Sequence, residues 1–321
     1  MSTALHVHAT GAPDGFCGMI GRHPSMLTLF DRIRRAAEQH MPVLIVGETG
    51  TGKELVAQAL HRLSGVRGTL VALNVAALSE QLADAELFGT VRGAYTGAVD
   101  RAGLIEAASG GTLFLDEASD LSGGTQARLL RTLESHTVRR LGGRQEHPIR
   151  FRLLVSSQRP AGALVVRGAW RDDFCHRVNG ITLRLPPLRE RPEDVPFLIN
   201  HVLRQLGCPT VSLVELRGAC SYPWPGNVRE LIRVVERAAF AAEGGPVKAC
   251  HLEAEIGGAA ESWSGADPGP ADSPRSEERA WIERTLREAG STKAAAHALG
   301  LSTDQLYRRF RALGIRAPRR R

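Results

Sequence analysis

The chain has 321 residues, five cysteines and a formal net charge of +7. This length predicts about two domains and allows a sizeable hydrophobic core. No apolar run approaches the ~20 residues needed to span a bilayer, and residues 1–15 lack the basic-then-apolar pattern of a secretory signal. The cysteines are scattered without a CxxC pair, which favours free thiols in a reducing cytoplasm over a disulfide or zinc framework; they are Cys17, Cys175, Cys208, Cys220 and Cys250.

The positive charge is concentrated near the end of the chain. Residues 275–321 hold twelve Lys and Arg against five Asp and Glu, whereas residues 1–274 hold 29 of each kind. A basic terminal segment beside a neutral body predicts a polyanionic partner, DNA or RNA before a membrane. Judged on charge alone, a solvated tail is an equally good interpretation.

The first two thirds of the chain have an α/β pattern. Residues 1–19 are rich in Gly, Ala and His, lack a periodic pattern, and are expected to form a flexible leader. Over residues 20–187 apolar strands alternate with amphipathic helices, which predicts a parallel sheet covered on both faces. The strand candidates are residues 42–46, 70–74, 112–115 and 151–155.

The last third is predominantly helical. Residues 188–256 have a helical pattern that is clearest at 228–242. Residues 257–276 are Gly, Pro, Ser and Ala with few large apolar groups, so they are expected to form a linker. Residues 277–314 are expected to be helical again, and the chain ends in three arginines.

A phosphate-binding loop is predicted between the first strand and the helix that follows it. Glycines let the backbone bend round a phosphate, and the helix N-terminus adds N–H groups and the positive end of its dipole. Lys53 can reach the terminal phosphates, although Glu54 stands where the strict motif has a Ser or Thr magnesium ligand. The flanking strand and helix disfavour a glycine turn without a ligand. The loop is Gly47, Glu48, Thr49, Gly50, Thr51, Gly52, Lys53 and Glu54.

A second apolar strand ends in two carboxylates, within the run GGTLFLDE at residues 110–117. Asp116 is expected to bind magnesium, directly or through water, and Glu117 to activate the attacking water as general base. Acidic residues after a strand can also be simple loop caps. The phosphate loop some 60 residues upstream favours the catalytic interpretation.

Further motifs follow in a fixed order. They are ELFG at 86–89, GAYTGA at 93–98, Arg171 and Arg177, LPPLRER at 185–191 and WPGNVREL at 224–231. Alone, the two arginines would be interpreted as surface ion pairs. As an ordered set over about residues 18–242, these motifs resemble the central AAA+ domain of the sigma-54-dependent activators, or bacterial enhancer-binding proteins. The resemblance implies an AAA+ P-loop NTPase core over 20–187 and a helical lid over 188–256.

The resemblance also implies roles for single residues. Ile20 and Gly21 match the adenine contacts, and Asn74 matches the asparagine that restrains the catalytic glutamate until the partner is engaged. Arg171 and Arg177 resemble arginine fingers that reach into the neighbouring subunit of a ring, usually a hexamer. Arg229 resembles the lid arginine that senses the γ-phosphate.

The GAYTGA segment is the output loop by resemblance, contacting sigma-54 and moving with ATP hydrolysis. Its residues are Gly93, Ala94, Tyr95, Thr96, Gly97 and Ala98. The alternative is a tight turn whose tyrosine packs inward. The sequence departs from the family where Tyr95 replaces phenylalanine, Val75 replaces cysteine, and Ser157-Gln158 replaces the Thr-Asn pair that senses the γ-phosphate.

The C-terminal segment resembles the Fis-type helix-turn-helix domain that ends many of these activators. A short helix over 291–299 ends at Gly300, and Ser302 suits an N-cap for the last helix. That helix turns Leu306, Phe310 and Leu313 inward. A three-helix bundle without a ligand is the alternative, which the local charge disfavours. The expected DNA contacts are Thr303, Asp304, Gln305, Arg308 and Arg309.

The sequence therefore predicts a cytoplasmic, sigma-54-dependent transcription activator. It is expected to use ATP and magnesium, to bind upstream DNA, and to remodel sigma-54 RNA polymerase holoenzyme as a ring of identical or paralogous subunits. Nineteen residues before the ATPase core are too few for a sensor domain, so the chain resembles the phage-shock and Hrp-type subgroup, with control by a separate protein as one possibility. A repressor that has lost the motor, and an unfoldase or clamp loader, are the competing hypotheses.

Overall fold

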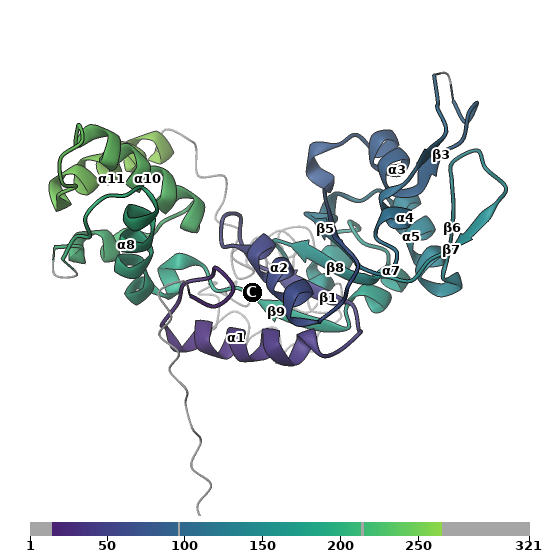
Figure 1. Ribbon diagram of the computed structural model, residues 1–321, viewed down its shortest axis with the longest axis horizontal. Helices are drawn as coiled ribbons and strands as arrows, with labels where there is room; N and C mark the ends of the chain where they lie inside the picture. The colour runs from purple at the N-terminus through teal and green to yellow at the C-terminus, as the bar shows by residue number, and fades with distance from the viewer. Residues whose placement is uncertain (1–14, 96, 213–214, 265–321) are drawn as a thin grey trace, which may run out of the picture. The chain divides into compact units, whose positions relative to one another are not determined.

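The computed structural model describes residues 15–95, 97–212 and 215–264, and the side chains of these residues up to 257 (Figure 1). The chain divides into two compact units, residues 1–256 and 257–321. The sheet and the lid helices up to residue 256 belong to the first unit. Within the described part of the chain, no helix is both long and apolar enough to cross a membrane.

A five-stranded parallel sheet forms the centre of the first unit, in the order β2-β5-β8-β1-β9. Its β1 strand is buried along its whole length, as expected for a strand covered on both faces. Because all the strands run in the same direction, their carboxyl ends meet at one edge of the sheet. The strands are β1 (Val43–Val46), β2 (Leu70–Asn74), β5 (Thr112–Asp116), β8 (Arg152–Ser157) and β9 (Ile181–Arg184).

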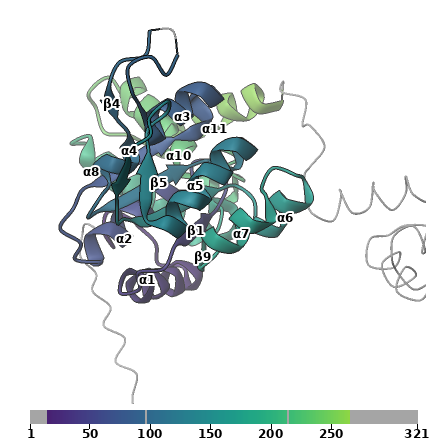
Figure 2. The same cartoon turned by 90° about the vertical axis from the view of Figure 1, so that its right-hand side faces the viewer.

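Two hydrophobic clusters cover the two faces of this sheet. Along β1, Val43 and Ile45 belong to one cluster and Leu44 and Val46 to the other, because successive side chains of a strand point to opposite faces. One cluster is completed by α1 (Pro24–Ala37) and α2 (Lys53–Leu63). The other is completed by helices that face the viewer in Figure 2, namely α3 (Glu80–Phe88), α4 (Leu104–Ala107), α5 (Gly123–Ser135), α6 (Ala161–Val166) and α7 (Asp172–Val178).

Two small antiparallel ladders lie outside this sheet. One pairs β3 (Gly89–Thr90) with β4 (Arg101–Ala102), and the other pairs β6 (Thr137–Arg139) with β7 (Glu146–Pro148). They are joined, since the Val91 N–H donates to the Leu141 carbonyl at 3.1 Å and the Leu141 N–H donates to Gly89 at 2.9 Å. Short 3₁₀ turns complete the connections, at Val75–Ala77, Ala118–Asp120, Leu188–Glu190 and Pro192–Asp194.

The lid is a group of helices that pack on one another (Figure 1). Trp224 is buried between them; its indole N–H donates to the Ala219 carbonyl at 2.9 Å, and its ring meets Tyr222 edge-on. Burial of a large aromatic ring whose polar atom is satisfied fixes this corner of the lid. The lid helices are α8 (Val195–Gln205), α9 (Arg217–Ser221), α10 (Asn227–Ala241) and α11 (Ala249–Ser264).

Asn227 joins the lid to the phosphate loop. It is fully buried and has a left-handed backbone, with φ 53°. Its side-chain oxygen accepts from the Leu188 N–H at 2.8 Å, and its amide nitrogen donates to Glu48 Oε2 at 3.2 Å and to the Thr49 carbonyl at 3.1 Å. Glu48 also forms a bidentate ion pair with Arg189, at 2.6 and 2.7 Å. Three separate chain segments therefore meet at one buried amide.

The predicted parallel sheet is confirmed, and each predicted strand is present within two residues of its expected bounds. The fifth strand, β9, was not predicted. Its sequence ITLR is only four residues long and is not part of a longer apolar run. The leader ends earlier than expected, since Phe16 stacks on Phe30 with ring centroids 4.7 Å apart and Met19 is buried. At the other end, α11 continues to Ser264, into the predicted linker 257–276.

The Glu48–Arg189 ion pair should make the stability of the protein depend on pH. Hydrogen bonds from Arg189 hold the pKa of Glu48 below its ordinary value of 4.5. A carboxyl with a lower pKa in the folded state stabilises the protein above its unfolded pKa, and this contribution is lost as the pH falls through the folded pKa. Glu48→Gln should therefore lower the melting temperature at pH 7, and this difference from wild type should shrink below about pH 4.5.

The pair is half exposed, so its free-energy contribution should not exceed about 1 kcal/mol. Arg189→Ala should cost about as much at pH 7, and the double variant little more than either single variant. Equal melting temperatures for wild type and Glu48→Gln at pH 7 would contradict this account.

Candidate functional site

The loop between β1 and α2 is shaped by its glycines. Gly50 and Gly52 have φ of 78° and 105°, which side-chain-bearing residues rarely adopt. A Cβ on Gly50 would lie 2.3 Å from the Gly226 carbonyl oxygen, so only glycine allows the lid to approach this closely. The helix α2 starts at Lys53, and its first N–H groups point toward the loop as an anion site requires.

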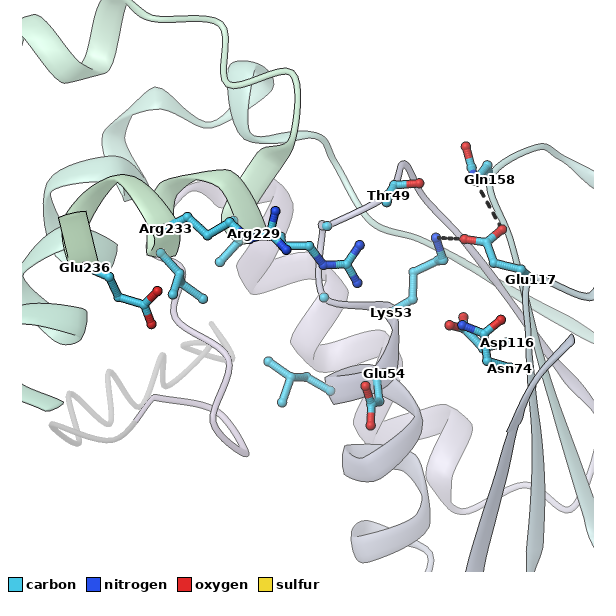
Figure 3. A pocket seen from close by; sticks show the side chains of 15 residues that line it. Thr49, Lys53, Glu54, Asn74, Asp116, Glu117, Gln158, Arg229, Arg233 and Glu236 are labelled. Atoms are coloured by element: carbon cyan, nitrogen blue, oxygen red, sulfur yellow. Dashed lines mark hydrogen bonds and ion pairs between the residues drawn. The ribbon is translucent and has the colours of Figure 1, made fainter. Parts of the chain in front are cut away.

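A cleft of about 650 Å³ opens beside this loop (Figure 3). Residues from the loop, from the ends of three strands and from the lid helix α10 contribute to its wall. The described lining residues are Thr49, Gly50, Gly52, Lys53, Glu54, Leu55, Asn74, Asp116, Glu117, Gln158, Val228, Arg229, Ile232, Arg233 and Glu236.

Lys53 and Glu117 form an ion pair inside this cleft. Lys53 is 7% exposed, and its ammonium donates to Glu117 Oε1 at 3.0 Å and to the Gly47 carbonyl at 3.0 Å. The other carboxylate oxygen of Glu117 accepts from the Gln158 amide at 3.3 Å, as the dashed lines in Figure 3 show. The structure thus brings the predicted lysine, the predicted general base and one predicted sensor residue together.

Asp116 ends β5 and Glu117 follows it in a left-handed conformation, with φ 52°. Ser156, at the end of the neighbouring strand β8, bonds to both residues. Its hydroxyl donates to Asp116 Oδ1 and accepts from the Glu117 N–H at 3.0 Å. Sequence reasoning missed Ser156, and the only signal available was a hydroxyl residue ending an apolar strand.

Asn74 lies at the carboxyl end of β2, directly opposite Asp116 in the sheet register, and lines the cleft. In the described structure the side-chain hydrogen bonds of Glu117 go to Lys53 and Gln158. Asn74 is therefore placed in the cleft as expected, and its predicted restraint of Glu117 stays a prediction. Ser157 is fully buried, and its hydroxyl accepts from the Arg159 N–H rather than facing the cleft.

The lid contributes a charged face to the cleft. Arg229 lines it as predicted, and its backbone N–H donates to the Gly50 carbonyl at 3.3 Å. Arg233 and Glu236 follow on the same side of α10, and Figure 3 shows all three side chains along that helix. The last two were not predicted; the i, i+4 and i+7 spacing of charged residues was the available signal.

Eight of the predicted catalytic, nucleotide-binding and sensor residues are not among those that line this cleft: Gly47, Glu48, Thr51, Ser157, Ile20, Gly21, Arg171 and Arg177. Arg171 caps α7 and forms a bidentate ion pair with Asp173, at 2.7 and 3.0 Å. Arg177 donates to the Leu133 carbonyl at 2.7 Å, and both arginines are exposed. Ile20 and Gly21 lie in the segment before α1, next to the Arg22 and His23 N–H groups, which donate to Asp194 Oδ1.

The GAYTGA segment lies between β3 and β4, away from the cleft. Gly93 and Gly97 have φ of 87° and 86° and no atom near the position of a Cβ. Tyr95 is 53% exposed, so the alternative of an inward-packed tyrosine is wrong, and the predicted role of the segment as an output loop stays a prediction. Thr96 lies outside the described residues.

Ion pairs hold the base of this loop. Arg140, the residue after β6, pairs with both oxygens of Glu106 at 2.7 and 2.9 Å and with Asp100 at 2.9 Å. Arg101 pairs with both oxygens of Glu86, at 2.7 and 3.0 Å.

The acidic end of the cleft fits magnesium. No cluster of three or more His, Cys, Asp or Glu side chains arranged to hold a metal is found among the described residues. Magnesium in nucleotide sites needs only one or two carboxylates, with waters and phosphate oxygens as the other ligands. Asp116 and Glu117 supply these hard oxygen donors beside the phosphate loop.

The expected DNA contacts Thr303, Asp304, Gln305, Arg308 and Arg309 lie outside the described residues, as does most of the predicted linker 257–276.

Comparison with known proteins agrees with this geometry. Residues 19–184 match the model of the sigma-54 interaction domain, and residues 189–268 match the AAA+ ATPase lid domain. The Nif-specific regulatory protein of Azotobacter vinelandii is 41% identical over 313 residues, covering 94% of this chain and 60% of that protein. The DNA-binding transcriptional regulator NtrC of Azospirillum brasilense is 39% identical over 311 residues, covering 93% and 62%.

Among solved structures, NtrX from Brucella abortus in complex with ATP superposes with a TM-score of 0.68 at 28% identity, covering 92% of this chain and 69% of that one. The chain spans about three fifths of the length of the two curated relatives. Both domain models match this chain in order, and the sheet, cleft and lid described above agree with them. This protein therefore belongs to the AAA+ family that carries the sigma-54 interaction domain.

Proposed function

We propose that this chain is an ATP-driven activator of sigma-54-dependent transcription. One observation carries the proposal: a phosphate loop, a Lys53–Glu117 pair and a lid arginine share one cleft, in a chain that also presents an exposed GAYTGA loop. A nucleotide-binding fold alone would fit many functions. The combination with this loop favours remodelling of sigma-54 RNA polymerase.

In this proposal the chain's own residues divide the work of hydrolysis. The phosphate loop and Lys53 hold the β- and γ-phosphates, and Asp116 holds a magnesium ion that neutralises their charge. Lys53 and Gln158 release the Glu117 carboxylate when they bind the nucleotide phosphates instead, and Glu117 then accepts a proton from the attacking water. Arg229 brings lid charge to the phosphates.

Arg171 and Arg177 are proposed to act on the site of a neighbouring subunit. Both are exposed, and neither lines the cleft of its own chain. An arginine supplied in trans is worth ~10³–10⁵ in rate, so the active species is an oligomeric ring. A hexamer of one chain is the simplest form, and a ring shared with a paralogue is compatible with the same contacts.

The C-terminal segment 277–321 is proposed to be a Fis-type helix-turn-helix that binds DNA upstream of the promoter, with Arg308 and Gln305 contacting base edges. The proposed location of the protein is the cytoplasm. The excess of basic residues in this segment supports the proposal. A separate regulatory protein is one proposed means of control.

Glu117→Gln should keep ATP binding and lower turnover by a factor of about 10² or more, because the amide cannot accept the proton of the attacking water. Turnover is measured by phosphate release and binding by fluorescence of a labelled ATP analogue. Glu134→Gln, an exposed change on α5, is the control and should behave as wild type. Near-normal turnover in Glu117→Gln would exclude Glu117 as the general base.

Removal of residues 277–321 should abolish specific DNA binding and leave ATP hydrolysis in place, since the cleft is built from residues before 257. The double variant Arg308→Ala, Arg309→Ala in the full chain should weaken DNA binding without any effect on hydrolysis. Loss of hydrolysis in the truncated chain would show that the segment stabilises the ATPase instead.

The whole proposal is tested by open-complex formation with purified sigma-54 polymerase on a supercoiled promoter. The wild-type chain should give ATP-dependent open complexes, and Thr96→Ala should hydrolyse ATP at the wild-type rate without forming them. Open complexes formed by Thr96→Ala would refute the role of the loop. Absence of hydrolysis in the wild-type chain would favour the repressor hypothesis.

A further inference from the structure

Ser156 holds an unusual place at the acidic end of the cleft. It is fully buried, one residue before the end of β8, and β8 lies between β5 and β1 in the sheet. Although it does not line the cleft, it bonds to the two carboxylate residues that do.

The pleat of the sheet explains why Ser156, and not its neighbour, makes these contacts. Leu154 packs in the cluster on the α2 face, whereas Leu153 and Val155 pack on the other face. Ser156 therefore points to the α2 face, where the phosphate loop begins. Phe114 belongs to the same cluster, which places Asp116, two residues later on β5, on that face as well. Ser157 points to the opposite face.

A single hydroxyl serves both residues of the acidic pair. As a donor it fixes Asp116 Oδ1, and as an acceptor it takes the N–H of Glu117 at 3.0 Å. A serine hydroxyl has one proton and two lone pairs, so both bonds are made at once. Glu117 needs this support, because its left-handed backbone, with φ 52°, is disfavoured for a residue with a side chain.

We propose that Ser156 is a positioning residue for ATP hydrolysis, which uses one hydroxyl to set the orientation of the Asp116 carboxylate and the backbone of Glu117. With Oδ1 held by Ser156, Oδ2 is the oxygen that Asp116 presents to a magnesium ion. With its N–H held, Glu117 keeps its carboxylate beside Lys53. The inference rests on the proposed magnesium site and on the proposed role of Glu117.

The test compares the full-length wild-type chain with Ser156→Ala and Ser156→Cys. Cysteine nearly matches serine in size but is a weak hydrogen-bonding group. A loss of function in Ser156→Cys therefore cannot be explained by a cavity. Both variants should lower kcat about tenfold or more and raise the magnesium concentration that gives half-maximal rate by a similar factor, as is usual for residues that orient metal ligands. The affinity for ADP in EDTA should stay unchanged.

A second readout is independent of turnover. Magnesium added to the ADP-bound chain should raise the melting temperature of wild type more than that of either variant, because only the wild type holds Asp116 in the binding orientation. Ser109→Ala is the matched control. Its hydroxyl accepts from the Arg150 N–H and so links the chain before β5 to that before β8 at the far end of the sheet, and its loss should leave every readout as in wild type.

Wild-type kcat and magnesium dependence in both variants would overturn the inference. So would a loss of ADP affinity in EDTA as large as the loss in kcat, since the defect would then lie in the whole cleft. A wild-type chain that hydrolyses ATP equally well in EDTA would instead reject the proposed magnesium site, whatever the variants do. The two failures are therefore distinguishable.

Discussion

The parallel direction of β1, β5 and β8 is the constraint on which the functional site depends. Because these strands lie side by side and end at the same edge, the phosphate loop after β1 comes beside the two carboxylates after β5. Open α/β sheets bind ligands at this edge for the same reason. Lys53 marks the meeting point: it is nearly buried, and it bonds both to the loop's own carbonyl groups and to Glu117.

The lid is joined to this edge through the backbone as much as through side chains. The close approach of Gly50 to Gly226 and the buried amide of Asn227 leave the phosphate loop little freedom to move independently of α10. A movement of the lid should therefore displace the phosphate loop directly, through these contacts. A nucleotide held by the loop should in turn bias the position of Arg229. This is the physical requirement for coupling between two packed elements.

The GAYTGA loop is built differently from the cleft. Tyr95 in this loop is exposed, whereas the base of the loop is held by two arginines that each bind a carboxylate in bidentate fashion. Bidentate arginine pairs are geometrically specific, so they can fix where the loop leaves the body of the domain.

Periodicity and local motifs were enough to predict the sheet, the phosphate loop and the acidic pair. Each of these depends on neighbours in the chain: buried strands have continuous apolar runs, and a loop that bends round phosphate needs glycine. The short strand β9, the packing of Phe16 on Phe30 and the cleft-facing Arg233 escaped prediction, because their partners are distant in sequence or belong to another element.

The sequence by itself determined the class of fold, the order of its elements and the residue types that handle a phosphate. Only the tertiary structure decided which residues hold the acidic pair in place. Gln158 and Lys53 share the carboxylate of Glu117, and Ser156 rather than Ser157 bonds to Asp116. Such choices depend on strand register and on the face to which a side chain points, and both are fixed by pairing between strands some 40 residues apart in the sequence, where a shift of one residue would exchange the two serines.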